Sequence, residues 1–339
     1  MPRPRVAVVG AGYWGINHVR TFAGEPGCDL TWVCDPSAHA LALARDLAPH
    51  ARCTETIRDV LEASDVDAVV LATPAATHAE LAVRVVESGR HILVEKPLAL
   101  SVDEARSVKA AGDRAGVVAL VGHLMLYHPV VERLGELLTS GELGHVYYLS
   151  SLRVNLGRLR SDENALWSFG PHDVSMIDGL VGQQPVSVTA RGMSCLQPGI
   201  EDVVFVTMRF RGGEMAHIQL SWLNPRKERR LTLVCSQKMV EFDDVSSDKL
   251  RIYDKGYDRP PEFTQFDQFL TARHGDVHIP QVPMVEPLHA EAAHFLDCIT
   301  RGVAPRTDLA SGLRVVRVLA AAERSLQRDG APVLLEEIP

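Results

Sequence analysis

Three glycines near the start of the chain have a spacing that suits phosphate binding. Gly10, Gly12 and Gly15 form a G-x-G-x-x-G pattern between an apolar run at 5–9 and the beginning of a helical pattern. In such a loop the first glycine permits a tight turn, the second lets a pyrophosphate approach the backbone, and the third allows close helix–strand packing. The positive end of the helix then faces the phosphates. Because ordinary glycine turns can show the same pattern, a second residue has to support this interpretation.

Asp35 gives that support. It lies 20 residues after Gly15, at the end of the next predicted strand, 30–34. A carboxylate at this position accepts hydrogen bonds from the ribose hydroxyls of a bound dinucleotide. It would also repel a 2′-phosphate, and no arginine follows it directly, so NAD is the predicted cofactor and NADP is less favoured.

A second candidate site follows another predicted strand. Glu95, Lys96 and Pro97 come directly after the apolar run 91–94, at the sheet edge where open α/β folds bind ligands. A lysine there could donate a hydrogen bond to a substrate hydroxyl and stabilise an alkoxide-like transition state. The plain alternative is a solvated surface lysine.

The elements that position these residues alternate between strand and helix. Buried-strand patterns occur at 5–9, 30–34, 51–54, 67–72, 91–94 and 117–121, with helical patterns between them. Capping-box patterns, Thr77 with Glu80 and Ser101 with Glu104, predict the beginnings of two of these helices. Such alternation predicts an α/β Rossmann domain with a doubly wound parallel sheet over residues 1–122.

The pattern changes after Gly122. Strand patterns occur at 146–154, 186–191, 203–210, 215–222, 231–235 and 239–242, and helical patterns at 130–139, 172–180, 286–300 and 309–327. Strands in one block with helices beside them predict a second, α+β domain over 123–339, with a large, open, mostly antiparallel sheet. One face of this sheet needs cover, which a second copy of the chain could supply.

The composition excludes several classes of function. A net charge of −8 and a pI near 6.0 argue against nucleic-acid or anionic-membrane partners. No apolar run reaches the roughly 18 residues that a membrane span needs, and no signal peptide is evident. The six cysteines form no C-x-x-C pair, and no histidine–carboxylate cluster has metal-ligand spacing. We therefore expect a cytoplasmic protein with a small-molecule substrate and no catalytic metal.

Several segments together resemble the Gfo/Idh/MocA family of oxidoreductases. They are GAGYWGINHVRTF, ATPAATHAELA, SGRHILVEKPLAL, VGHLMLYHP and PHDVSMI. The resemblance extends over nearly the whole chain. The stretch NLGRLRSDENALWSFGPHD is similar to a subgroup that acts on nucleotide-linked sugars.

The resemblance implies roles for particular residues. Lys96 corresponds to the catalytic lysine, with a cis bond to Pro97, and His172 corresponds to a general acid/base, a role that imidazole suits. Many relatives carry an aspartate four residues before this histidine, whereas this chain has Ser168. Serine cannot hold a charge there, and Asp173 would face another side of the helix, so any proton relay must differ.

The remaining predicted contacts fall into two sets. The cofactor residues are Gly10, Gly12, Tyr13, Trp14, Gly15, Asp35, Thr73, Pro74, His78, Glu95 and Lys96. The substrate residues are Lys96, His123, Asn155, Arg158, Arg160, Ser168 and His172. Arg153 joins the two arginines in a cationic segment that would suit a diphosphate or carboxylate, unless it is simply a solvated loop. Tyr13 and Trp14 would cover the pyrophosphate, reach the substrate or pack between domains.

The expected activity is hydride transfer between nicotinamide and a sugar hydroxyl or keto carbon. The favoured substrate is a nucleotide-linked hexose reacting at its 3-position. The alternatives are an inositol, free-aldose or glucoside dehydrogenase, transient oxidation that drives an elimination, and a non-catalytic NAD-binding sensor. Relatives usually assemble through the open sheet, so the resemblance implies a homodimer or homotetramer.

Overall fold

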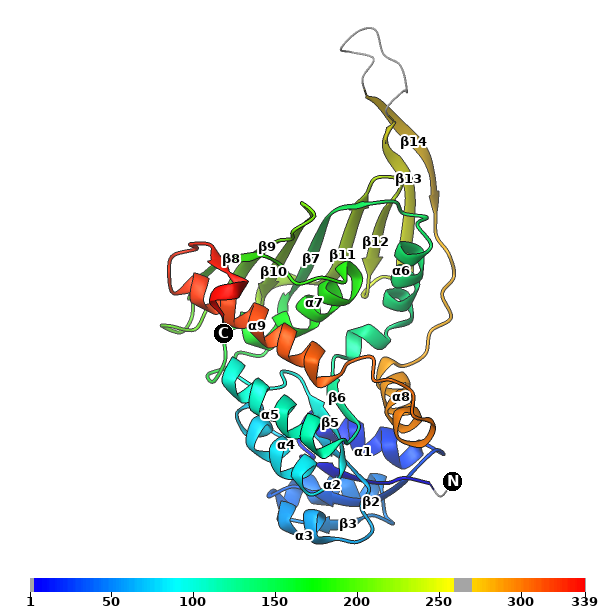
Figure 1. Cartoon of the computed structure of the whole chain (residues 1–339), viewed down its shortest axis with the longest axis vertical. Helices are drawn as coiled ribbons and strands as arrows, with labels where there is room; N and C mark the ends of the chain where they lie inside the picture. Colours follow the sequence, from blue (N-terminus) through cyan, green and yellow to red (C-terminus); the bar gives the residue numbers. More distant parts are fainter. Residues whose placement is uncertain (1–2, 259–269, 339) are drawn as a thin grey trace. The chain divides into compact units, whose positions relative to one another are not determined.

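The structure is a computed structural model that describes residues 3–258 and 270–338. The chain divides into two compact units (Figure 1), Met1–Tyr127 with Val285–Val316, and His128–Met284 with Arg317–Pro339. The first unit thus extends five residues past the expected boundary at residue 122. It also includes Val285–Val316, a segment that we expected in the second domain.

The sheet of the first unit has six parallel strands. They are β1 (Arg5–Val9), β2 (Asp29–Cys34), β3 (Arg52–Thr54), β4 (Ala68–Leu71), β5 (His91–Glu95) and β6 (Ala119–Gly122). Their order is β3-β2-β1-β4-β5-β6, and every pairing is parallel. The strand order reverses between β1 and β4, which is where open α/β sheets bind ligands. The predicted Rossmann sheet is confirmed.

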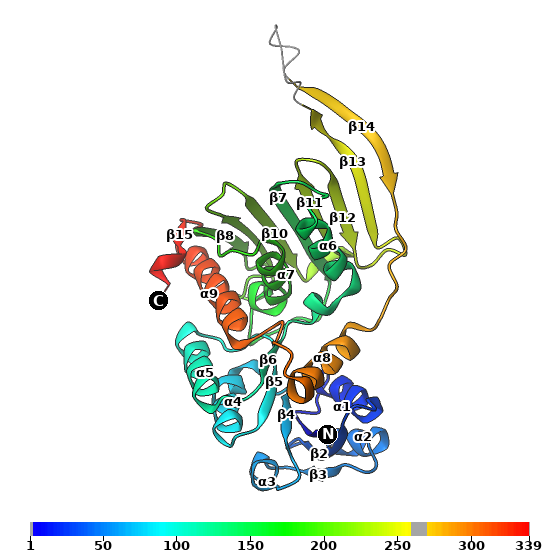
Figure 2. The ribbon, with the colours of Figure 1, turned by 45° about the vertical axis from the view of Figure 1, so that its right-hand side comes forward.

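Helices lie beside these strands (Figure 2). They are α1 (Gly15–Gly24), α2 (Ala38–Leu47), α3 (Ile57–Glu62), α4 (His78–Glu87) and α5 (Val102–Ala115), with short 3₁₀ turns η1 (Ala75–Thr77) and η2 (Leu124–Tyr127). The capping box at Ser101 and Glu104 is confirmed, with reciprocal bonds of 3.2 and 3.1 Å. The one predicted at Thr77 is wrong, because its hydroxyl bonds instead to Thr73 Oγ1 and the Pro74 carbonyl.

Helix α8 (Pro287–Arg301) belongs to the first unit because its apolar face completes that unit's core. Ala292, Phe295 and Leu296 are buried in the same cluster as Val6 and Val33 of the parallel sheet. The helix also contacts α1 and η2. Apolar spacing correctly indicated a helix here, but it could not indicate which core the helix covers.

The second unit contains a nine-stranded sheet. Its strands are β7 (Val146–Leu156), β8 (Ser187–Met193), β9 (Val203–Arg209), β10 (Met215–Ser221), β11 (Leu223–Cys235), β12 (Met239–Asp243), β13 (Leu250–Asp258), β14 (Thr271–His278) and β15 (Val333–Leu334). The order is β14-β13-β12-β11-β7-β10-β9-β8-β15, and only β7–β10 is parallel. The predicted large, mostly antiparallel sheet is confirmed. Strands β13 and β14, which Figure 1 shows extending beyond the other strands, were not predicted.

The helices of this part of the chain are α6 (Pro129–Thr139), α7 (Ala165–Val181) and α9 (Leu309–Leu326), whose first residues belong to the first unit. Helix α7 contacts β7, β9 and β10. It begins after Asn164, whose side chain accepts the Trp167 N–H, and it contains Pro171 in its interior. The predicted helix, 172–180, began too late because proline is favoured in a helix's first turn. No helix in the described residues is long and apolar enough to cross a bilayer.

Candidate functional site

The glycine loop of the first unit is tightly packed at two of its glycines and open at the third. Gly10 has φ +92°, and a Cβ there would lie 2.5 Å from the Ala72 carbonyl oxygen. A Cβ on Gly15 would lie 2.0 Å from the Gly10 oxygen. A Cβ on Gly12 would meet no atom within 4 Å. Gly12 therefore lies beside open space, and this arrangement fits the approach of a pyrophosphate to the backbone.

We expect Gly12→Ala to weaken NAD binding about tenfold or more while leaving stability within about 0.5 kcal/mol, because the new methyl group would occupy only the ligand's space. Calorimetric titration and denaturant unfolding measure the two effects. Gly24→Ala is the matched control, since Gly24 also has no neighbour within 4 Å of an added Cβ. Unchanged NAD affinity in Gly12→Ala would show that the cofactor does not approach this residue.

Asp35 is fixed beside this loop at the end of β2. Its Oδ2 accepts the Ala11 N–H at 2.7 Å and its Oδ1 accepts the Ser37 N–H at 2.8 Å. A carboxylate has about four acceptor positions, so each oxygen retains capacity for a further donor such as a ribose hydroxyl. The first unit therefore fits a dinucleotide at both its pyrophosphate and its ribose.

The loop after β4 is held in place by His78. Its Nδ1 lies 2.7 Å from the Pro97 carbonyl oxygen and its Nε2 lies 2.8 Å from the Thr73 carbonyl oxygen. The side chain is buried, and both of its nitrogens already face main-chain carbonyls. His78, the first residue of α4, therefore holds the loops of Thr73-Pro74 and Pro97 together, and its place in the cofactor-lining loop stays a prediction.

Glu95, at the end of β5, connects several of the predicted cofactor residues. Its Oε1 accepts the Trp14 indole N–H at 2.5 Å and lies 2.7 Å from His18 Nε2, and its Oε2 accepts the Lys96 N–H at 3.1 Å. Burial alone raises the pKa of Glu95. The His18 hydrogen bond and charge, the Lys96 charge and the Trp14 hydrogen bond outweigh that effect and lower the pKa below its ordinary value. The peptide bond between Lys96 and Pro97 is cis, as the resemblance implied.

His18 is a functional candidate that the sequence analysis missed. It is fully buried on α1, three residues after Gly15 and on the side that faces Glu95. Its position one helical turn into α1 was the available signal, because residues three apart on a helix share a face. Of the glycine-loop aromatics, Trp14 is tied to this group, whereas Tyr13 is 87% exposed.

His123 follows β6 and is only 1% exposed. Among the described residues, neither of its ring nitrogens has a hydrogen-bond partner. Its pKa is lowered to about 4, mainly by burial; the charge of Glu95 opposes this shift, and the charges of Lys96 and Arg314 add to it. The imidazole is therefore neutral near pH 7 and can donate at one nitrogen and accept at the other.

The second unit places its predicted substrate residues along β7, α7 and the loop between them. Asn155 lies near the end of β7, Arg158 and Arg160 are exposed in the loop, and Ser168 and His172 lie one helical turn apart on α7. Both Ser168 and His172 are partly buried. The structure thus brings these five residues into one stretch of a single unit.

Arg153 is not part of that exposed cationic loop. Its Nε lies 2.6 Å from Asp173 Oδ2, and the Ser151 hydroxyl donates to Asp173 Oδ1 at 2.7 Å. Arg153 and Asp173 are both buried, so this ion pair fixes α7 on β7. Arg158 and Arg160 are therefore the exposed cations of the predicted cationic segment. Asp173 pairs with Arg153 and so does not take the role of the aspartate that many relatives have where this chain has Ser168.

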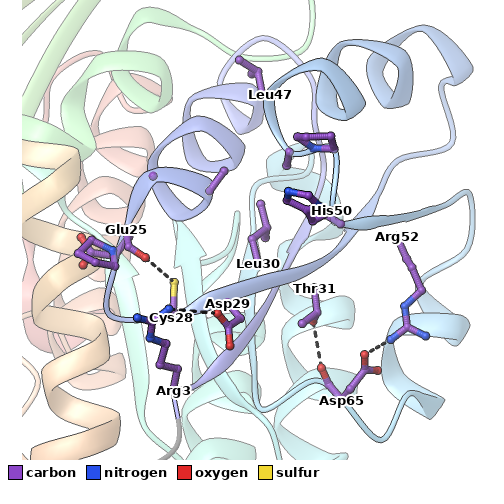
Figure 3. A pocket seen from close by; sticks show the side chains of 16 residues that line it. Arg3, Glu25, Cys28, Asp29, Leu30, Thr31, Leu47, His50, Arg52 and Asp65 are labelled. Atoms are coloured by element: carbon purple, nitrogen blue, oxygen red, sulfur yellow. Dashed lines mark hydrogen bonds and ion pairs between the residues drawn. The ribbon is translucent and has the colours of Figure 1, made fainter.

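A pocket lies at the opposite edge of the parallel sheet (Figure 3). It is lined by residues near the beginnings of β2, β3 and β4, including Asp29, Arg52 and Asp65. Four of its charged groups form two ion pairs, Arg3 with Asp29 at 3.7 Å and Arg52 with Asp65. The glycine loop and Asp35 are at the other ends of the strands, so this pocket is separate from the dinucleotide site.

Two family models match the chain. One is described as "Oxidoreductase family, NAD-binding Rossmann fold" and covers residues 4–123, and the other as "GFO/IDH/MocA C-terminal domain" and covers residues 131–241. The chain belongs to the Gfo/Idh/MocA family of oxidoreductases. The family resemblance in the sequence is confirmed, and with it the NAD-binding character of the Rossmann domain.

Individual members of the family are similar along nearly their whole length. The UDP-N-acetylglucosamine 3-dehydrogenase of Acidithiobacillus ferrooxidans is 28% identical, over 96% of this chain and 99% of the relative. The scyllo-inositol 2-dehydrogenase (NAD(+)) of Bacillus subtilis is 25% identical, over 98% of this chain and 96% of the relative. A solved structure from Magnetospirillum magnetotacticum MS-1, described only as an oxidoreductase, has 35% identity and a TM-score of 0.81, covering 95% of this chain and all of that one.

Proposed function

We propose that this Gfo/Idh/MocA oxidoreductase is an NAD-dependent dehydrogenase that transfers a hydride between nicotinamide and the CH–OH or keto carbon of a sugar. The observation that carries the proposal is the group at the carboxyl edge of the parallel sheet. There the open Gly12, the fixed Asp35 carboxylate and the Glu95–Lys96 segment follow β1, β2 and β5 of one unit.

The choice of NAD over NADP rests on Asp35. Its carboxylate is bonded to the Ala11 and Ser37 backbone and cannot readily turn away. A 2′-phosphate at the adenosine ribose would meet this negative charge, whereas the two free hydroxyls of NAD would donate to it.

In the mechanism, the chain's own residues handle binding and the proton. Bound NAD supplies the hydride acceptor for oxidation and, as NADH, the hydride donor for reduction. Lys96 exchanges a proton with the reacting hydroxyl, and His172 acts as a second acid/base. Ser168 places no negative charge one turn before His172, so this histidine is held without the carboxylate of many relatives. For His123 the predicted contact with a substrate hydroxyl requires its buried ring nitrogens to become accessible.

We propose a nucleotide-linked hexose, reacting at its 3-position, as the substrate. The similarity to a UDP-N-acetylglucosamine 3-dehydrogenase supports this class, and so do the exposed Arg158 and Arg160, because guanidinium groups suit a diphosphate. The similarity to an inositol dehydrogenase supports the alternative of a polyol or free sugar without a diphosphate.

A substrate panel tests the proposal. Purified enzyme, checked for bound NAD, is mixed with UDP- and dTDP-hexoses, inositols, glucose and simple glucosides while NADH absorbance is followed. We expect turnover with a nucleotide sugar and a loss of apparent affinity, by about tenfold, in the double variant Arg158→Ala/Arg160→Ala. Turnover only with inositol or glucose would overturn the substrate class. Bound NAD without turnover on any compound would favour transient oxidation or a sensor.

Assembly and location are further proposals. The face of the nine-stranded sheet opposite α7 exposes Tyr148, Phe205 and Met215, which the strand register places on one side. Exposed apolar patches of this kind mark association surfaces, so we propose a homodimer or homotetramer of this chain through that face. A cytoplasmic location also stays a prediction.

A further inference from the structure

The Glu95 carboxylate is immobilised by contacts within the first unit. Trp14 and His18 hold one oxygen and the Lys96 N–H holds the other, at 2.5, 2.7 and 3.1 Å. Gly122 packs closely against the same carboxyl, since a Cβ added to this glycine would lie 3.2 Å from it. A buried carboxylate so enclosed acts on its surroundings through its fixed charge.

A second carboxyl, Glu291 on α8, lies in the same unit and is fully buried. Neither of its oxygens has a hydrogen-bond partner among the described residues. An ionised carboxylate buried without a partner is strongly unfavourable, so the group keeps its proton. Burial, followed by the negative charge of Glu95, raises the pKa of Glu291 well above its ordinary value.

The groups around Glu291 do not offset this effect. Helix α8 packs against α1 and η2, and its apolar face lies on the core of the parallel sheet. Of their titratable groups, His18 has Nε2 bonded to Glu95 and a buried Nδ1 without a hydrogen-bond partner among the described residues. Arg20 pairs with Glu286 at the surface, and the Tyr127 hydroxyl bonds to Thr307. On α8 itself, His294 Nε2 accepts the Arg306 N–H, and Asp297 pairs with Arg301. None of these contacts involves the Glu291 carboxyl.

We propose that Glu95 is a positioning residue whose negative charge favours the ammonium form of Lys96, and that Glu291, in the same unit, stays protonated. This inference rests on the proposed function, because it concerns the acid–base role of Lys96. Two interacting buried carboxyls do not both ionise. The negative charge resides on Glu95 because its carboxylate accepts hydrogen bonds. An ionised Glu291 would have no hydrogen-bond donor among the described residues.

The consequence is a dependence of the reaction on pH that Glu95 sets. A fixed negative charge beside an ammonium group stabilises the protonated lysine. In alcohol oxidation the neutral amine accepts the proton, so the rate rises as Lys96 loses its proton. The pH of this acid limb in the kcat/KM profile therefore reports the charge next to Lys96.

Glu95→Gln and Glu291→Gln form a matched pair of tests. Glu95→Gln keeps an acceptor for Trp14 but removes the charge, so the acid limb should move to lower pH by about one unit or more. Glu291→Gln replaces one neutral group by another. The acid limb of its kcat/KM profile should therefore stay within about 0.3 pH unit of the wild-type position. An unmoved limb in Glu95→Gln, or an equal shift in Glu291→Gln, would overturn the proposal.

Infrared spectroscopy tests the proton on Glu291 without any turnover. A protonated carboxylic acid has a carbonyl stretch separate from that of carboxylates. We expect this band in the wild type at neutral pH, its retention in Glu95→Gln and its loss in Glu291→Gln; its absence from the wild type would overturn the inference. If Lys96 proves dispensable for turnover, the proposed function fails, while the infrared band can still show that Glu291 is protonated. If Lys96 is essential but the acid limb does not move, only this inference fails.

Discussion

Lys96→Ala is expected to lower kcat/KM about a thousandfold while NAD affinity stays within about threefold of wild type, because positioned acid–base catalysis contributes about 10²–10⁴-fold. The lysine follows β5 at the carboxyl edge of the sheet, next to the buried Glu95 charge. Its contact with Glu95 that fixes the loop is made by the backbone N–H, which alanine retains. The substitution thus removes the acid–base group and leaves the cofactor's other contacts in place. Steady-state kinetics with the best substrate of the panel, together with calorimetric NAD titration, measure both quantities.

Lys109→Ala is the matched control. Lys109 lies on α5 and pairs with Asp113 at 2.6 Å, away from the strand ends that carry the glycine loop and Lys96. Its loss should leave kcat/KM and NAD affinity unchanged, since exposed ion pairs of this kind contribute little. A Lys96→Ala enzyme with turnover within about threefold of wild type would show that another group handles the proton.

The parallel sheet could be predicted closely from the sequence because of how its strands are buried. Strands covered on both faces appear as continuous apolar runs, and Arg5–Val9 and Ala68–Leu71 match their predicted segments to within two residues. Strands β13 and β14 lack such a pattern, because β14 is largely exposed, β13 is buried only at Leu250 and Ile252, and both carry polar residues on both faces. Their pairing depends on each other and on β12, which is a long-range property.

The candidate site was predictable where a local motif defines it and not where distant elements meet. The glycine loop and Asp35 follow from spacing over a single strand–helix–strand unit. His18 and Glu291 meet the Glu95 environment only after α1 and α8 pack beside the sheet. The sequence likewise groups Arg153 with Arg158 and Arg160, but its partner is Asp173, 20 positions away on α7.

Gly15→Ala is expected to disrupt both the fold of the first unit and its cofactor site. The new Cβ would lie 2.0 Å from the Gly10 oxygen and 2.8 Å from the Gly10 carbonyl carbon, and both are backbone atoms. Gly10 cannot yield easily, because it lies against the Ala72 backbone and has φ +92°. Helix α1 must therefore move away from β1, at a cost of about 3 kcal/mol in unfolding free energy. This displacement also moves the loop, so we expect NAD affinity to fall about a hundredfold.

Denaturant unfolding and calorimetric titration separate this effect from those of the other two glycine variants. Gly24→Ala, at the far end of the same helix, should change neither stability nor binding, because its added methyl group meets no neighbour. Gly12→Ala should change binding alone, and Gly15→Ala should change both. This order follows from which atoms surround each Cβ position: none at two of the glycines and the backbone at the third. A Gly15→Ala protein with wild-type stability and NAD affinity would mean that α1 does not pack on β1 as closely as described, and the argument for the pyrophosphate site would lose its geometric basis.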